Sequence, residues 1–253
     1  MQKFDLTGRI ALVTGSSQGI GFALAKALGQ AGARVILNGR DRSKLDTAAS
    51  ELRGAGLQVD SCAFDVTNPG AVTQGIAWIE REVGPIEILV NNAGIQRRMP
   101  LQDFPPETWA EVMRINLDSV FYVGQAVARA MIPRGHGKII NICSVQSELG
   151  RPTIAPYTAS KGAVKMLTKG MCADWAGHGL QVNGLGPGYF ETELTRPLVE
   201  NKEFTAWLRK RTPAGRWGKV EELGGAVVFL AAPASDFVNG QILYVDGGLT
   251  SVV

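Results

Sequence analysis

The chain has 253 residues, of which 45% are hydrophobic, and this content suffices to bury one sizeable core. A formal net charge of +3 is too small to indicate nucleic-acid binding, for which a local basic cluster would be needed. The three cysteines, Cys62, Cys143 and Cys172, are widely spaced without metal-ligand spacing, so we expect no metal site and a reduced, cytoplasmic setting.

The N-terminal residues enter a strand pattern directly and no apolar run is long enough to span a bilayer, so we expect no signal sequence and no membrane segment. Short β-rich segments then alternate with helical spacing, with strands predicted at 9–14, 33–38, 57–64, 86–91, 138–143, 180–185 and 241–245. The alternation predicts one α/β domain over 1–253, with helices on both faces of a doubly wound, seven-stranded parallel sheet. Ligands bind such sheets outside the carboxyl ends of the strands, so the residues that follow each strand are the candidates for a site.

The first predicted strand leads into a glycine-rich turn, and a helix pattern follows at once. Glycines permit the tight turn and let a pyrophosphate approach the backbone, while the helix N-terminus offers free N–H groups and a positive dipole end. The spacing G-x-x-x-G-x-G differs from the commoner G-x-G-x-x-G of dinucleotide sites, and an ordinary glycine-rich turn is the alternative. We predict that the dinucleotide-binding residues of this turn are Gly15, Ser17, Gln18, Gly19, Ile20 and Gly21.

The end of the second strand bears on which dinucleotide binds. A carboxylate there would hydrogen-bond an adenosine ribose and repel a 2′-phosphate, whereas an arginine accommodates that phosphate. Gly39 leaves space, and Arg40 can form a charge-assisted fork with a phosphate. Asp41 opposes this interpretation unless it caps the following helix. The segment predicts NADP(H), with NAD(H) possible and a solvated Arg40 as the alternative.

Three further segments follow strands and are expected to complete the crevice. Asp65 and Val66 are placed to meet the adenine. After the fourth strand, small residues let the backbone approach a ribose, and after the sixth a threonine could reach a carboxamide. The residues of these last two segments are Asn92, Ala93 and Gly94, then Pro187, Gly188 and Thr192.

The fifth strand and the helix after it carry the candidate chemistry. Tyr157 and Lys161 are four residues apart, so they share one face of a helix. A neighbouring ammonium and an oxidised nicotinamide would favour the phenolate and lower the pKa of Tyr157, which could then relay an alcohol proton during hydride transfer. Ser144, at the strand end, would hold the substrate oxygen. The alternative is a tyrosine used for packing and a solvated lysine.

The chain carries the motifs Thr14-Gly15-x-x-x-Gly19-x-Gly21, Asn91-Asn92-Ala93-Gly94, Asn116, Ser144, Tyr157-x-x-x-Lys161 and Pro187-Gly188. Taken together, they resemble the short-chain dehydrogenase/reductase family over essentially the whole chain. The resemblance implies a Rossmann-type domain with Tyr157 as acid/base, Lys161 as its pKa-lowering and ribose-binding partner, Ser144 as the carbonyl-positioning hydroxyl and Asn116 as holder of a proton-relay water. It also implies a homotetramer whose main interface uses the helices near 107–132 and 157–178. Gln18 departs from the family, because members that prefer NADP(H) often carry a basic residue there.

Two segments suggest the substrate. Arg97 and Arg98 lie just beyond the fourth strand, where a guanidinium could hold a carboxylate in a bidentate pair. The alternatives are that they are solvated, lie beside a cofactor phosphate or contact another subunit. Gln146 and Glu148, between Ser144 and Tyr157, suit several hydroxyl groups. Segments 92–98, 141–149, 187–190 and 211–218 resemble family members that interconvert D-gluconate and 5-keto-D-gluconate. That subgroup implies a sugar-acid substrate and a mobile lid around 189–215, with Tyr189 in it.

Two other functions stay open. A 3-oxoacyl-carrier-protein reductase shares every motif above and would need a basic docking surface, for which Arg129 and Arg134 are available. A catalytically silent nucleotide-binding protein is the alternative of a different class, although it would have no chemical need for Ser144, Tyr157 and Lys161 together. His136 and His178 lie in glycine-flanked segments that indicate helix-end turns, and we expect no catalytic role for them.

Overall fold

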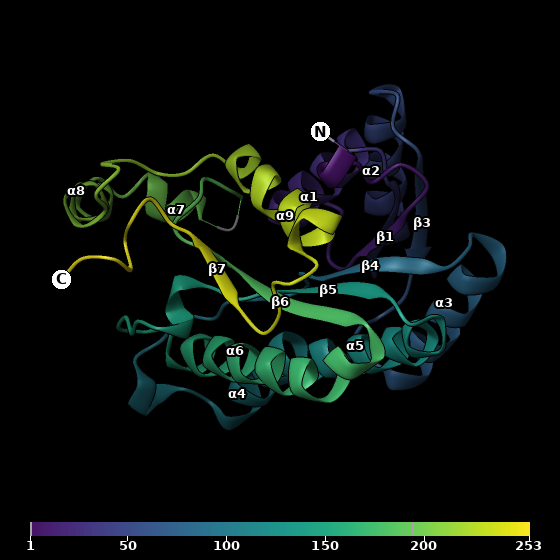
Figure 1. The fold of residues 1–253 in the computed structure, drawn as a ribbon. Helices are drawn as coiled ribbons and strands as arrows, with labels where there is room; N and C mark the ends of the chain where they lie inside the picture. The colour runs from purple at the N-terminus through teal and green to yellow at the C-terminus, as the bar shows by residue number, and fades with distance from the viewer. Residues whose placement is uncertain (1, 194) are drawn as a thin grey trace.

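Seven parallel strands form the centre of the computed structural model, which describes residues 2–193 and 195–253 (Figure 1). The strands are β1 Ile10–Val13, β2 Arg34–Gly39, β3 Val59–Ala63, β4 Ile86–Asn91, β5 Gly137–Ile142, β6 Leu180–Pro187 and β7 Ile242–Val245. Their order in the sheet is β3-β2-β1-β4-β5-β6-β7, so the direction of winding reverses between β1 and β4. The predicted doubly wound sheet is confirmed, and every strand lies within two residues of its predicted bounds.

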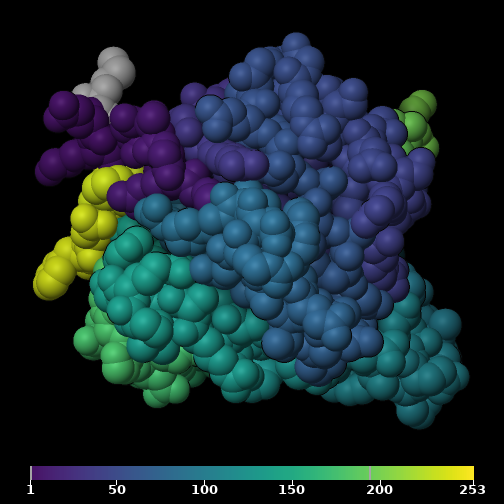
Figure 2. All heavy atoms as spheres, turned by 90° about the vertical axis from the view of Figure 1, so that its right-hand side faces the viewer, coloured from purple at the N-terminus to yellow at the C-terminus, as the bar shows by residue number. Residues whose placement is uncertain are grey.

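Helices cover both faces of this sheet. They are α1 Gly19–Gln30, α2 Arg42–Gly54, α3 Pro69–Glu82, α4 Pro106–Met113, α5 Ser119–Met131, α6 Ala155–Trp175, α7 Arg196–Val199, α8 Lys202–Arg211 and α9 Gly224–Ala231, with a π-helical turn at Arg114–Asp118 between α4 and α5. In Figure 1, α1, α2 and α9 lie above the sheet and α3, α4, α5 and α6 lie below it. Turned by 90°, the surface beside the β3 edge is formed mostly by the first half of the chain (Figure 2).

Alternate residues of each central strand supply the two cores. In β1, Ala11 and Val13 pack into the core that holds Leu24 of α1, while Ile10 and Leu12 pack into the core that holds Val123 of α5. Successive side chains of a strand point to opposite faces, which explains why a continuous apolar run marks a strand covered on both sides. Each fully buried aliphatic side chain contributes about 1.5–3 kcal/mol, so these two layers dominate the stability of the fold.

Local signals fix where the helices begin and end. The carboxylate of Asp41 accepts a hydrogen bond from the backbone N–H of Lys44 (3.2 Å) and caps α2, and Asn68 caps α3 in the same way. Gly135 and Gly179 adopt left-handed backbone angles after short 3₁₀ turns. His136 and His178 lie beside these glycines, in the helix-end turns that the sequence indicates.

The segment between β6 and α9 departs from the layered arrangement. Its helices α7 and α8 lie beyond one end of the sheet, at the left of Figure 1, together with the C-terminus. The guanidinium of Arg211 in α8 donates to the carbonyl oxygens of Leu249 (3.1 Å) and Val252 (3.0 Å), which fastens the C-terminal residues to this helix. None of the helices described here combines the length and apolar character that a membrane crossing requires.

Candidate active site and cofactor crevice

Hydrogen bonds lock the turns that follow β1 and β4 to each other. The hydroxyl of Thr14 accepts from the backbone N–H groups of Asn92 (2.9 Å) and Ala93 (3.1 Å), and the Asn92 amide donates to the carbonyl oxygens of Thr14 and Gly15, both at 2.9 Å. Gly15 has φ 61°, and a Cβ there would stand 2.8 Å from the Cα of Ala93. Only glycine fits such a position. The point where the sheet reverses its winding is therefore held rigidly.

The N-terminus of α1 opens onto this junction. A Cβ on Gly21 would stand 2.4 Å from both the Asn92 amide nitrogen and the Gly15 carbonyl oxygen, so the absence of a side chain lets the helix approach the β4 turn. Gln18, at the N-cap position, makes no side-chain hydrogen bond to the helix. The first N–H groups of α1 are thus available to an anion, which the helix dipole also favours.

A crevice of about 520 Å³ runs along the carboxyl ends of the strands, within the ~300–1,000 Å³ usual for ligand sites. Its lining includes fifteen of the seventeen predicted cofactor residues: Gly15, Ser17, Gln18, Gly19, Ile20, Gly21, Arg40, Asp65, Val66, Asn92, Ala93, Gly94, Tyr157, Lys161 and Thr192. The other two, Pro187 and Gly188, line the cavity that adjoins it. The glycine cradle, the free helix N-terminus and the size of the crevice fit a dinucleotide.

Basic side chains gather at the β2 end of the crevice. The side chain of Arg40 is 70% exposed, and its guanidinium lies 3.8 Å from the carboxylate of Asp65. Asp41 caps α2, as the NADP(H) interpretation requires, and it also lines the crevice. Lys44, which sequence reasoning missed, also lines the crevice from the first turn of α2. Its position three residues after the helix cap was the available signal.

Asp65 is held ionised by its neighbours. Burial opposes the charge, but the backbone N–H and the hydroxyl of Thr67 both donate to Asp65 at 2.8 Å, and together with the charge of Arg40 they keep its pKa below the usual value. The carboxylate can therefore act only as an acceptor, as recognition of an adenine amino group requires.

Lys161 and Tyr157 lie one turn apart near the start of α6. The Lys161 side chain is only 4% exposed, its Nζ donates to the carbonyl oxygen of Ile142 (2.6 Å), and it stands 5.8 Å from the centre of the Tyr157 ring. Burial lowers the pKa of Lys161 to about 8, with a partly opposing contribution from Cys143. The shared helical face that the four-residue spacing predicts is thus present.

The pKa of Tyr157 differs from the sequence expectation. Burial raises it, and hydrogen bonding by Ser144 only partly offsets the rise. The expected lowering by Lys161 is not realised by the protein groups, because a phenolate here loses its hydration and the lysine ammonium is directed at the Ile142 carbonyl. Lowering the pKa of Tyr157 therefore also requires the positive charge of a bound oxidised nicotinamide.

Ser144 ends β5 and begins the 3₁₀ turn Val145–Ser147. Its hydroxyl accepts from the backbone N–H of Gln146 (3.2 Å). The hydroxyl of Ser147 accepts from the backbone N–H of Ser144 (3.3 Å) and donates to the carbonyl oxygen of Lys161 (2.8 Å). The turn that carries Ser144 is thereby fastened to the helix that carries Tyr157.

Asn116 is fully buried in the π-helical turn between α4 and α5. Its side-chain oxygen accepts from the backbone N–H of Ile95 (2.8 Å), and its nitrogen donates to the carbonyl oxygen of Ile95 (2.9 Å) and to the Ser160 hydroxyl (3.1 Å). Both amide hydrogens are used, so the side chain joins the β4 turn to α6. The role of Asn116 in holding a relay water stays a prediction.

A second cavity adjoins the crevice, and Tyr157 borders both. It lies among the loops that follow β4, β5 and β6, and Ser144, Gln146, Arg98, Arg151 and Tyr189 line it. Arg98 and Arg151 are its basic lining residues, and no carboxylate side chain is among its described lining residues. The side-chain oxygen of Gln146 is buried without a hydrogen-bond partner in the described structure, so it can accept from a bound hydroxyl.

The structure separates the two arginines that the sequence places side by side. Arg97 forms a fork with the carboxylate of Glu111 in α4 (2.8 and 3.1 Å) and lines the cofactor crevice. Arg98 donates to the side-chain oxygen of Gln96 (3.0 and 3.3 Å) and lines the second cavity. Of the two, Arg98 is the one placed beside Ser144 and Tyr157.

Two placements on the β5–α6 loop correct the sequence interpretation. Glu148 does not line the cavity, because it lies beyond the 3₁₀ turn and its carboxylate accepts from Lys165 (2.5 Å) and from the Tyr244 hydroxyl (2.7 Å). Arg151, which was not predicted as a site residue, lines the cavity instead. Its long basic side chain, in the same loop as Gln146 and Glu148, was the signal for it.

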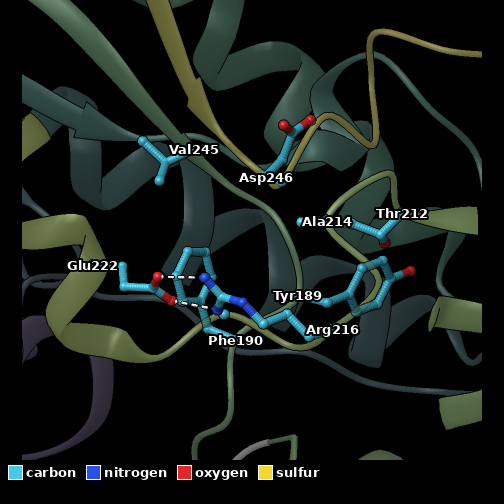
Figure 3. A pocket seen from close by; sticks show the side chains of 10 residues that line it. Tyr189, Phe190, Thr212, Ala214, Arg216, Glu222, Val245 and Asp246 are labelled. Carbon is cyan, nitrogen blue, oxygen red and sulfur yellow. Dashed lines mark hydrogen bonds and ion pairs between the residues drawn. The ribbon is translucent and has the colours of Figure 1, made fainter.

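Tyr189 lines both the second cavity and a third, and Figure 3 shows it in the third. Its ring meets those of Phe204, Trp207 and Trp217 edge to face, with centroids 5.7, 6.2 and 5.8 Å away. In the third cavity the dashed lines of Figure 3 mark the fork between Arg216 and Glu222, which lowers the pKa of Glu222 to about 2. The charges of this ion pair satisfy each other, and neither Ser144 nor Tyr157 lines that cavity.

Comparison with known proteins gives close matches along the chain. The family model described as Enoyl-(Acyl carrier protein) reductase matches residues 15–250. Gluconate 5-dehydrogenase of Gluconobacter oxydans (strain 621H) is 64% identical over 247 residues, covering 98% of this chain and 96% of that protein. The 5-keto-D-gluconate 5-reductase of Escherichia coli (strain K12) is 54% identical over 250 residues, covering 99% of this chain and 98% of that protein.

A solved structure is equally similar. The crystal structure of a gluconate 5-dehydrogenase from Burkholderia cenocepacia J2315, in complex with NADP and tartrate, superposes with a TM-score of 0.98 at 63% sequence identity. It covers 100% of this chain, and this chain covers 99% of it.

Proposed function

Since the chain belongs to the short-chain dehydrogenase/reductase family, we propose that it is an NADP(H)-dependent oxidoreductase that interconverts D-gluconate and 5-keto-D-gluconate. Two relatives with more than half of their residues in common carry names for this reaction, and a third was solved with NADP.

The cavity beside Ser144 and Tyr157 is the observation that carries the choice of substrate. It presents the guanidinium groups of Arg98 and Arg151 and, among its described lining, no carboxylate that would neutralise them. A sugar acid supplies the missing anion. Its carboxylate and its reacting 5-position lie at opposite ends of the carbon chain, so one end can meet the arginines while the other meets Tyr157.

The proton transfer and the stabilisation of the reacting oxygen are assigned to residues of the chain. Bound NADP⁺ would accept the hydride from the alcohol carbon. Tyr157 takes the alcohol proton through its phenolic oxygen, the Ser144 hydroxyl donates a hydrogen bond to the developing negative oxygen, and the positive charge of the oxidised nicotinamide would favour the phenolate. In the reverse direction Tyr157 returns the proton to the ketone oxygen. Asn116 is assigned the relay water through which Tyr157 exchanges its proton with solvent.

We propose that different turns of the crevice would hold different parts of the cofactor. The N-terminus of α1 would hold the pyrophosphate, Arg40 and Lys44 would hold the 2′-phosphate, and Asp65 with Val66 would meet the adenine. The turn from Asn92 to Gly94 would meet a ribose, which Lys161 would also contact. Pro187, Gly188 and Thr192 would meet the carboxamide, and the segment 189–215 would close as a lid that excludes water.

We also propose that the enzyme is a cytoplasmic homotetramer. The faces of α4, α5 and α6 expose Trp109, Phe121 and Met166, which a subunit interface would cover. The free thiols of Cys62, Cys143 and Cys172 suit a reducing compartment. Light scattering should give a mass about four times the 27.0 kDa of one chain.

The two alternatives receive less support. Arg134, a candidate for docking an acidic carrier protein, is occupied by a fork with Glu80 (2.6 and 3.3 Å) and by the Ile86 carbonyl (2.8 Å). A silent nucleotide-binding protein would not need Ser144, Tyr157 and Lys161 gathered at one end of the crevice.

NADPH oxidation separates the three functions. We expect turnover of 5-keto-D-gluconate by the wild type and a loss of at least ~100-fold in kcat for Tyr157→Phe, which keeps the ring but removes the proton donor. Faster turnover of an acetoacetyl thioester would identify the carrier-protein reductase. Binding of NADPH without turnover of either substrate would identify the silent protein.

A further inference from the structure

Arg151 joins the substrate cavity to the lid helix α8. Arg151 lines the cavity with Arg98 and Tyr189. Its guanidinium lies over the ring of Phe204 in α8, with its central carbon 5.2 Å from the ring centroid. This distance falls within the ~6 Å over which a cation is attracted to an aromatic face. Phe204 is not itself among the residues that line the cavity.

The polar groups of Arg151 are incompletely satisfied by the protein. Its Nε is buried without a hydrogen-bond partner in the described structure, and the guanidinium forms no ion pair with a described carboxylate. Glu148, three residues earlier, is turned toward Lys165 and Tyr244. Burial, and then the nearby charge of Arg151, lower the pKa of Arg98, which indicates two positive charges that lack a shared anion.

The backbone sets the spacing of the two arginines. The N–H of Met99 donates to the carbonyl oxygen of Thr153 (3.0 Å), which ties the loop of Arg98 to the loop of Arg151. Thr153 has φ 71°, a left-handed conformation that is unfavourable for a β-branched residue. Such strain is kept where the surrounding structure requires it, often at a binding site. The pair of guanidinium groups is therefore held ready for an anion before one binds.

We propose that Arg151 binds the substrate carboxylate together with Arg98, and that Phe204 positions Arg151, so that carboxylate binding and the seating of α8 are coupled. The inference rests on the proposed sugar-acid function and deepens it. Each oxygen of a carboxylate can accept from a different guanidinium, and Arg151 is then fixed between the anion and the Phe204 ring. Phe204 also contacts Tyr189 and Trp217, so the whole aromatic cluster follows the position of α8.

The kinetic test compares 5-keto-D-gluconate with L-sorbose, which carries a hydroxymethyl group in place of the carboxylate. For Arg151→Met we expect the KM for the acid to rise about 10- to 100-fold, as loss of a charge-assisted pair implies, with kcat nearly unchanged and kcat/KM for L-sorbose within about two-fold of wild type. Arg151→Lys should recover only part of the loss, because the fork and the stacking are absent. Arg81→Met is the matched control, because this exposed arginine of α3 lines neither the cavity nor the crevice, and it should leave the kinetics with both substrates unaffected.

The positioning role of Phe204 is tested by Phe204→Leu. We expect the KM for the acid to rise about 3- to 10-fold, in proportion to the weaker cation–π contact, and the kinetics with L-sorbose to stay the same. Hydrogen exchange of residues 202–211 in the presence of NADP⁺ should slow when D-gluconate is added to the wild type. It should not slow for Arg151→Met.

The outcomes that would overturn the proposal are distinct from those that concern the function. Equal losses with the acid and with L-sorbose would make Arg151 a structural residue. An acid KM unchanged in Arg151→Met and raised only in Arg98→Met would remove Arg151 from carboxylate binding. A wild type that slows exchange of α8 with D-gluconate through Arg151, but does not turn over 5-keto-D-gluconate, would overturn only the proposed reaction.

Discussion

Lys161 shows how a single buried charge can lower the stability of the folded chain. Its ammonium is buried beside Tyr157 and has one hydrogen bond, to the Ile142 carbonyl. The folded pKa of about 8 lies below the ordinary lysine value of 10.5, so the unfolded chain binds the extra proton between these pH values. Stability at this site therefore rises as the pH increases from about 8 to 10.5, and the full penalty of about 3 kcal/mol applies below pH 8.

Lys161→Met should accordingly abolish activity and raise stability at pH 7. After subtracting about 1 kcal/mol for the lost hydrogen bond, a net gain of about 2 kcal/mol corresponds to roughly 4–8 °C in Tm. Thermal unfolding of the cofactor-free proteins at pH 7 and pH 10 measures this, and the advantage of the variant should shrink at the higher pH. A lower Tm for the variant at both pH values would contradict the burial of an uncompensated charge.

Arg40 and Lys44, which line the crevice, are the residues proposed to hold the 2′-phosphate. We expect Arg40→Ala to weaken NADPH binding about 10- to 100-fold and Lys44→Ala to weaken it less, with NADH affected by neither, because only the 2′-phosphate needs the charges. Fluorescence titration with both cofactors measures this. Arg42→Ala, at an exposed neighbouring position outside the crevice lining, is the control. Equal losses of affinity for NADPH and NADH would show that the two residues stabilise the protein structure rather than bind the 2′-phosphate.

Several site residues could be predicted from the sequence and others could not, and their contacts in the structure explain the difference. Tyr157, Lys161 and the Gly15–Gly21 turn follow predicted strands at diagnostic spacing, and local order suffices to place them. Arg97 and Arg98 are equivalent in sequence and are separated only by Glu111, fourteen residues away. Glu148 faces away because Lys165 and Tyr244 attract it, and Tyr244 lies on a distant strand. Long-range partners of this kind leave no local pattern.

Among the elements, α1 shows how a missing side chain determines the placement of a helix. Gly21→Ala should push α1 away from the β4 turn, because its Cβ would stand 2.4 Å from backbone and amide atoms that cannot move independently. We expect a Tm several degrees lower, in line with the ~1–3 kcal/mol cost of overpacking, and much weaker NADPH binding. Differential scanning fluorimetry with and without cofactor measures both effects.

Gly54→Ala is the control for this element. Gly54 ends α2, and a Cβ added there would meet no neighbouring atom within 4 Å, so the substitution should be neutral or slightly stabilising. If Gly21→Ala unfolded no earlier than Gly54→Ala, the close approach of α1 to the β4 turn would not contribute to stability.

The strands were the most predictable elements, and the segment between β6 and α9 was the least. Runs such as Ile10–Val13 are apolar on both faces because both faces of the sheet are covered. Such a run can be recognised from the local sequence alone, without knowledge of what packs against it. Helix α8 packs instead through Phe204 against Tyr189 and Trp217, and the spacing of these residues in the sequence has no helical or strand period. Only the family resemblance indicated that this segment belongs beside the substrate.

At the scale of the whole molecule, the cofactor crevice joins turns that belong to nearly every strand. A ligand that binds there stabilises only the folded chain, so NADPH at 100 times its dissociation constant should add about 2.7 kcal/mol, or roughly 5–10 °C in Tm. Unfolding curves at increasing NADPH concentration measure this, and NADH should need a higher concentration for the same shift. A shift confined to one of two separate transitions would show that the two halves of the sheet unfold independently.

The strand order also divides the ligand-binding loops of the molecule into two groups, one on each side of the point where the winding reverses. Residues assigned to phosphate and adenine recognition follow β1, β2 and β3, on one side of the reversal, whereas Arg98, Arg151 and Tyr189 follow β4, β5 and β6. Tyr157 stands where the two parts meet. Substitutions can therefore accumulate in the loops of one half and alter what is oxidised, without disturbing the electron carrier bound by the other half. Enzymes that descend from such a gene can therefore come to act on different substrates while they continue to use the same cofactor.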